Sequence, residues 1–166
     1  MRKNGFDNTR LYRLHQEQLT GLRAAERQAI ELLPRLAAVA ASEDVASLFE
    51  AIGTESEIQL ERLEKLMRAM DPADEFGITP LPPEIGISLN SFANSDGPDG
   101  DAALLAVAQR ALGYQIATYE SACDTARDVR AHPLLDILLL NLDEERATSA
   151  ALAELAGRDE PLLRAI

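Results

Sequence analysis

Carboxyl and amide side chains recur near the middle of four otherwise apolar helical stripes, and these side chains are the ones best suited to chemistry. Steps of three and four residues define the inward face of each expected helix. The polar members of the four stripes are, in chain order, Glu26, Glu55, Gln59, Gln115, Glu145 and Ser149. Burial of a lone carboxylate costs several kcal/mol, so such groups must be paired, protonated, hydrated or bound to a cation.

Two interpretations of these mid-stripe residues follow. In the first, the carboxylates point inward and build a metal site, as they do in di-iron bundles. In the second, each Glu lies at the edge of its stripe and extends to water. Because Glu26, Glu55 and Glu145 take similar places on three different helices, we expect a shared buried polar layer. This layer also contains Gln59, Gln115 and Ser149.

The elements that must position this layer are long helices. Glycine and proline are nearly absent from about 9–70 and 101–157, which are rich in Ala, Leu, Glu and Arg. We predict helices over about 9–41, 43–70, 101–130 and 133–157. The segment 71–100 is rich in Pro and Gly and is expected to be a long crossover. The predicted fold is all-α: a ferritin-like four-helix bundle with a long crossover between its second and third helices, in a single domain over 1–166.

Local signals set the expected helix ends. Pro34 predicts a kink or a break near Leu33. Ser42 is a suitable N-cap for the second helix, and Asp99 or Asp101 for the third. Gly157 predicts the end of the fourth helix.

The charge balance and composition exclude several classes of function. Sixteen Lys and Arg against 28 Asp and Glu give a net charge of −12, so we expect no nucleic-acid partner. No apolar run is long enough to span a bilayer, and the N-terminus is polar, so we expect a cytoplasmic protein with no membrane partner. The single cysteine, Cys123, is expected to be a buried structural thiol, and His15 is expected to be exposed among polar neighbours.

At this point the sequence resembles the YciE/YciF-type family of bacterial, stress-associated, ferritin-like proteins. The resemblance rests on an ordered set of segments: Ala25-Glu26-Arg27-Gln28 with Leu33-Pro34, then Glu55 with Gln59-Leu60-Glu61-Arg62-Leu63-Glu64, then Ala108-Gln109-Arg110 with Tyr114, and Leu142-Asp143-Glu144-Glu145. The resemblance implies a dimetal site of Glu and His ligands, in which Glu26, Glu55 and Glu145 match the acidic positions. It also raises the expectation of a homodimer.

This chain departs from the family pattern at several ligand positions. Ile52 stands where the family usually has His, and Leu112, Gly113 and Gln115 stand in a segment that usually reads Glu-His-Tyr-Glu. A di-iron carboxylate site typically uses about four Glu and two His. Three Glu remain here, and loss of the imidazoles removes donors that favour Fe and Zn over Mg or Ca.

We therefore expect a degenerate dimetal site, no cofactor, and a role in stress that depends on binding or assembly and not on catalysis. The alternative is a metal-binding protein, for iron, or an oxidoreductase, with a carboxylate-only site. A single divalent cation in an oxygen cage is the corresponding alternative cofactor. The sequence does not identify a protein partner.

Overall fold

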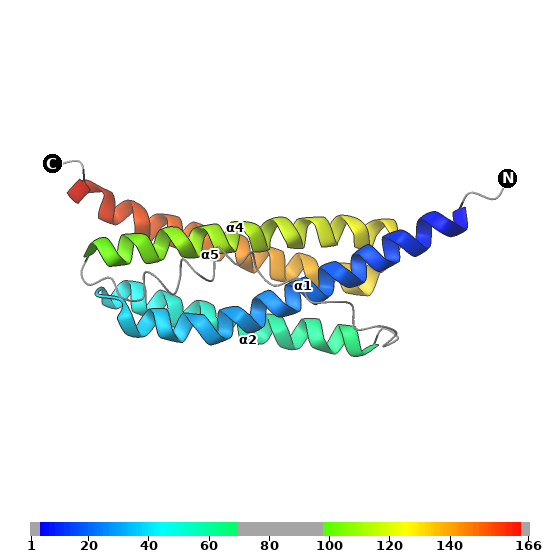
Figure 1. Ribbon diagram of the computed structural model, residues 1–166, viewed down its shortest axis with the longest axis horizontal. Coiled ribbons are helices and arrows are strands. Elements are labelled where there is room, and N and C mark those ends of the chain that lie inside the picture. Colours follow the sequence, from blue (N-terminus) through cyan, green and yellow to red (C-terminus); the bar gives the residue numbers. More distant parts are fainter. Residues whose placement is uncertain (1–3, 70–97, 164–166) are drawn as a thin grey trace.

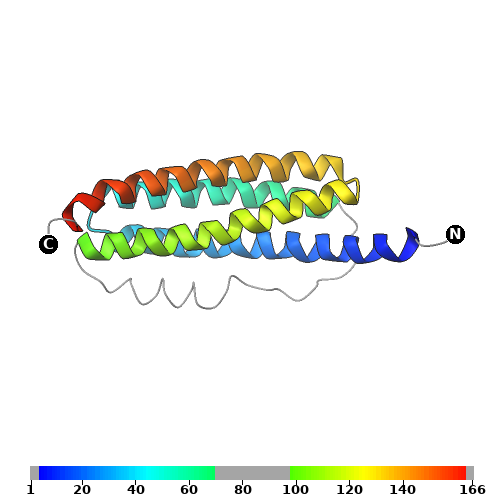
Figure 2. The same cartoon turned by 90° about the horizontal axis from the view of Figure 1, so that it is seen from above.

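The computed structural model describes residues 4–69 and 98–163, and this part of the chain is almost entirely helical. Its helices, labelled as in Figure 1, are α1 (Asn4–Val39), α2 (Glu43–Ala69), α4 (Pro98–Asp128) and α5 (His132–Leu163). They form an elongated bundle with the two termini at opposite ends (Figures 1 and 2). None of these helices is long and apolar enough to cross a membrane.

The directions of the helices are those that a ferritin-like bundle requires. The hairpin of α1 and α2 lies against the hairpin of α4 and α5, and α2 runs parallel to α4 (Figure 1). Consecutive helices that run parallel need a long connection, because the chain must return along the bundle before the second one begins. The predicted crossover at 71–100 falls mostly outside the described residues, although Pro98 to Gly100 already belong to α4.

The observed helix ends differ from the predicted ones for local reasons. Helix α1 continues through Pro34 to Val39, so of the predicted kink or break near Leu33, the break does not occur. Helix α5 continues past Gly157, which does not adopt the left-handed conformation that ends many helices. Ser42 directly precedes α2 as predicted, and its carbonyl oxygen accepts the amide of Ala46 at 3.0 Å.

Two apolar clusters fill the bundle, one toward each end. The first contains Phe49, Leu105 and Leu112 among others, and the second contains Leu22, Leu63 and Leu138. The buried polar residues of the four stripes lie between them along each helix. Cys123 is buried within the second cluster, which confirms its structural placement.

Asp101 holds the α1–α2 connection in place from α4. Its side chain is 3 % exposed, and its two oxygens accept the backbone amides of Ala41 at 2.8 Å and Ser42 at 2.7 Å. The sequence predicted Asp99 or Asp101 as the cap of the third helix; instead α4 begins at Pro98, a favoured first position, and Asp101 serves the neighbouring hairpin.

Loss of this carboxylate should destabilise the bundle. We expect Asp101→Ala to lower the free energy of unfolding by about 2–4 kcal/mol, because two backbone amides lose charge-assisted hydrogen bonds to a buried carboxylate. Urea denaturation measures the change, and the exposed Asp136→Ala variant is the matched control, with an expected change below about 0.5 kcal/mol. Equal effects of the two variants would contradict this role of Asp101.

Candidate functional site

The polar residues predicted from the stripes lie in one buried layer, with a contribution from each helix. Glu26 on α1, Gln59 on α2, Gln115 on α4 and Glu145 on α5 are each at most 6 % exposed. Glu55 and Ser149 are only half-buried. The electrostatics confirm that the carboxyl groups are neighbours, because the charges of Glu26 and Glu55 both raise the pKa of Glu145.

Glu26 is held by a hydrogen-bond chain from α4 and α5. The Tyr119 hydroxyl donates to Glu26 Oε1 at 2.7 Å, and Asn141 Nδ2 donates to the Tyr119 oxygen at 3.1 Å. Burial raises the pKa of Glu26 to about 7, while the hydroxyl of Tyr119 and the nearby Ser56 and Gln115 oppose this rise. Glu26 Oε2 accepts no hydrogen bond from the described residues.

Glu145 is the most strongly perturbed carboxyl group. Burial raises its pKa to about 9, and the charges of Glu26 and Glu55 add to the shift. Gln59 lies close enough to oppose the shift. Near neutral pH this side chain is therefore a neutral carboxylic acid, able to donate a hydrogen bond.

The outer edge of the layer is a polar seam between α2 and α5. Thr148 Oγ1 donates to Glu55 Oε2 at 2.7 Å, and Gln59 Nε2 donates to Glu144 Oε2 at 3.2 Å. Arg62 pairs with Glu144 at 2.6 Å. The guanidinium group of Arg62 is therefore paired with Glu144 and not with the buried carboxyl groups.

Several residues of the layer were not predicted as polar partners. Thr148, not Ser149, contacts Glu55, because the inward face of α5 passes one residue before the predicted position. Asn141 lies one helical turn before Glu145, so the spacing of four residues could have identified it. Tyr119 lies four residues after Gln115 on the same face of α4, but helical periodicity alone does not indicate that its hydroxyl has a polar partner.

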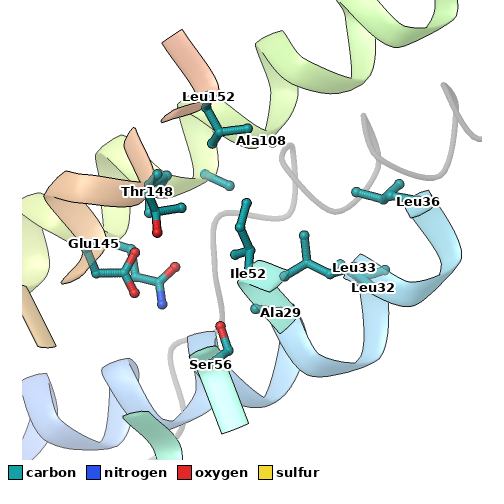
Figure 3. Close-up of a pocket in the computed structure, with 13 residues that line it drawn as sticks. Ala29, Leu32, Leu33, Leu36, Ile52, Ser56, Ala108, Glu145, Thr148 and Leu152 are labelled. Atoms are coloured by element: carbon teal, nitrogen blue, oxygen red, sulfur yellow. The ribbon is translucent and has the colours of Figure 1, made fainter. Parts of the chain in front are cut away.

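The substituted ligand positions do not all face the layer. Ile52 and Leu112 line an apolar cavity beside Glu145 (Figure 3). Gly113 is exposed, and a Cβ atom at that position would meet nothing within 4 Å, so a side chain there would extend away from the layer.

His15 does not join the layer, although it is buried. The prediction that it is exposed was wrong: its side chain has no exposed surface, and burial lowers its pKa. Eleven residues separate it from Glu26 along α1, which corresponds to about 16 Å. It therefore supplies no imidazole to the carboxyl groups.

The donor set does not fit a pair of transition-metal ions. Within residues 4–69 and 98–163, no group of three or more His, Cys, Asp or Glu side chains is arranged to hold a metal ion. The layer offers carboxyl groups from three helices, with amides and hydroxyls as the remaining polar groups. A hydrogen-bonded layer of neutral and partly ionised acids is the chemistry that this arrangement supports.

Comparisons with known proteins agree with this fold. The sequence profile of the family described as domain of unknown function DUF892 matches residues 10–160. The crystal structure of the Escherichia coli stress protein YciF is 24 % identical in sequence, with a TM-score of 0.80 over 91 % of this chain and 97 % of that one. YcfI from Rhodopseudomonas palustris is 24 % identical, with a TM-score of 0.75 over 86 % of this chain and 92 % of that one. Among curated proteins, none matches the sequence.

The raised pKa values predict that the protein loses stability as the pH rises. The pKa values of Glu26 (about 7) and Glu145 (about 9) in the folded state both exceed the ordinary value of 4.5. Between about pH 4.5 and pH 9 the folded state therefore binds more protons than the unfolded state. We expect the free energy of unfolding to fall by several kcal/mol from about pH 5 to pH 9.

Substitution separates this effect from the general acidity of the chain. Glu145→Gln should flatten the decline between pH 7 and pH 9, whereas Glu57→Gln, at an exposed position of α2, should leave it unchanged. Urea denaturation at fixed ionic strength measures both. A stability that increases over this pH range would contradict the buried, protonated state of Glu145.

Proposed function

We propose that this chain, which belongs to the DUF892 family and has a YciF-type ferritin-like fold, is a stress-associated bundle protein with a degenerate dimetal site. In this proposal Glu26, Glu55 and Glu145 are the remnants of the metal ligands. The protein acts by binding or assembly and performs no catalysis.

The observation that carries this proposal is the way in which the layer is closed by hydrogen bonds. Tyr119 donates to Glu26 and Thr148 donates to Glu55, so one oxygen of each carboxyl group is already occupied by a protein donor. A donor that points at a carboxylate oxygen stabilises it without a cation. Ile52 and Leu112 supply apolar packing at two further positions that the family resemblance assigns to ligands.

Metal analysis tests the proposal directly. Protein purified without chelator should contain well under one equivalent of iron by elemental analysis, and Fe(II) added in air should give no ferroxidase absorbance change. One or more equivalents of iron together with such a change would overturn the degenerate-site proposal. The Ile52→His, Gln115→Glu double variant is the positive control: it adds an imidazole and a carboxylate beside Glu145, and its metal content should rise.

A metal-binding function is the second candidate, and one observation favours it. Glu26 Oε2 and Gln59 Oε1 are buried oxygens without a hydrogen-bond donor among the described residues. Hard cations such as Mg²⁺ or Ca²⁺ bind oxygen ligands of this kind. If this candidate is correct, millimolar Mg²⁺ or Ca²⁺ should raise the melting temperature, and Glu26→Gln should abolish the increase.

We also propose that the protein is a cytoplasmic homodimer in which the N-terminal part of α1 contacts the partner. This part of α1 extends beyond the other helices (Figure 1), and it exposes Tyr12 and Leu14. Exposed apolar side chains on a protruding helix lose unfavourable contact with water when a second copy covers them.

The dimer is testable with a matched pair of variants. Leu14 and Leu140 are both 44 % exposed, but Leu140 lies on the outer face of α5. We expect Leu14→Asp to convert the protein to a monomer in sedimentation equilibrium and Leu140→Asp to leave it dimeric. A monomeric parent protein would contradict the proposal.

A further inference from the structure

A surface groove lies between α2 and α5, at the end of the bundle opposite the N-terminus (Figure 1). Its volume is about 290 Å³, and it is open to solvent. Six residues line it: Asp44, Ser47, Leu48, Ala151, Glu154 and Leu155. The two leucines are half-buried and the two acidic residues are exposed, so the groove has an apolar base and an acidic rim. These features suit an apolar side chain that is flanked by cations.

The N-terminal part of α1 presents such a set of side chains. Arg10, Arg13 and Leu14 are spaced three and four residues apart, so they lie on one face of the helix, and all three are exposed. Four of the sixteen Lys and Arg residues, and only one Asp, occur among the first fourteen residues. This segment is therefore basic, with a net charge of +3 in a chain whose total is −12. Its charge is complementary to that of the groove.

The basic face and the groove of one chain are too far apart to meet. From Leu14 to the end of α1 at Val39 the helix rises about 38 Å, and the groove begins at Asp44, just beyond the α1–α2 connection. A contact between these two surfaces must therefore join different copies. When two copies lie antiparallel, the N-terminal end of each is at the groove end of the other, so both contacts form together by twofold symmetry.

We propose that the groove between α2 and α5 binds the N-terminal part of α1 from a second copy of this chain. In this contact Leu14 packs against Leu48 and Leu155, and Arg10 and Arg13 pair with the acidic rim. A groove of about 290 Å³ is larger than a cavity of about 150 Å³ that holds benzene, so a leucine side chain fits. The inference rests on the proposed homodimer, and it adds the surface on which α1 docks and the chemistry that selects it.

Charge reversal tests the contact in sedimentation equilibrium. The Arg10→Glu, Arg13→Glu variant and the Asp44→Arg, Glu154→Arg variant each place like charges at both contacts. Each variant alone should therefore dimerise at least about ten-fold more weakly than the parent protein. A mixture of the two variants should form a heterodimer with close to the parental affinity, because both of its contacts again pair opposite charges. Variants that remain dimeric alone, or a mixture that remains monomeric, would overturn the proposal.

A matched control separates this contact from a general effect of net charge. The Lys65→Glu, Arg110→Glu variant changes the net charge by the same amount as reversal of the two arginines, at exposed positions outside both surfaces. It should dimerise with the parental affinity. Circular dichroism establishes that each variant is folded. A control that dissociates to the same extent would show that net charge alone governs association, and the proposed contact would be wrong.

Cysteine cross-linking locates Leu14 without a change of charge. In a Cys123→Ala background, the Leu14→Cys variant is mixed with the Ala151→Cys variant and oxidised in air with a copper catalyst. A disulfide forms only where the two Cα atoms come within about 7 Å, so the mixture should give a linked heterodimer. Ala153→Cys, which is exposed on another side of α5, is the control and should give little of this product. Equal yields from the two mixtures would contradict docking in the groove.

The parent protein distinguishes failure of this contact from failure of the proposed homodimer. A parent protein that is monomeric refutes the homodimer, and the contact with it. A dimeric parent whose charge-reversed variants are also dimeric refutes only the docking of α1 in this groove.

Discussion

Three carboxyl groups that meet inside a helical bundle cannot all remain ionised without a cation, and the interior of this protein is arranged around that constraint. Burial and mutual repulsion favour the protonated forms of Glu26 and Glu145, whose pKa values rise to about 7 and about 9. Glu55, at the edge of the layer, instead accepts a hydrogen bond from Thr148. In the proposed degenerate site, protons and hydroxyl donors take the place that two metal ions hold in di-iron bundles.

The same constraint explains the positions of the neighbouring residues. Tyr119 is buried among apolar side chains of the second cluster, yet its hydroxyl reaches Glu26, and Asn141 in turn supplies a donor to that hydroxyl. Burial, together with the charges of Glu26 and Glu145, raises the pKa of Tyr119 well above its ordinary value, so it remains a donor at any physiological pH. Polar groups from three helices must therefore keep a fixed axial register, which restricts how far the helices can slide.

Helical periodicity predicted the fold and most of the inward residues, because a stripe of period 3.6 depends only on local sequence. Glu26, Gln59, Gln115 and Glu145 were found in this way. The parts that failed depend on contacts between helices. Asp101 turned out to hold the α1–α2 connection, and His15 is buried although its sequence neighbours are polar. The sequence predicted Ser149 as the inward residue of α5, but the buried residue is Thr148, one position earlier. Several polar residues on α5 fit the stripe almost equally well, so periodicity could not distinguish them.

The seam between α2 and α5 has a mechanical consequence. Of the four neighbouring pairs of helices, α2 and α5 are the least closely packed, and polar side chains such as Arg62, Gln59 and Glu144 connect them, whereas each hairpin is closely packed within itself. The two hairpins are therefore joined more tightly along α1 and α4 than along α2 and α5. Separation of α2 from α5 would break these polar contacts and part of the apolar packing of both clusters, but it would break less packing than separation of any other neighbouring pair, so this side of the bundle is the least firmly closed.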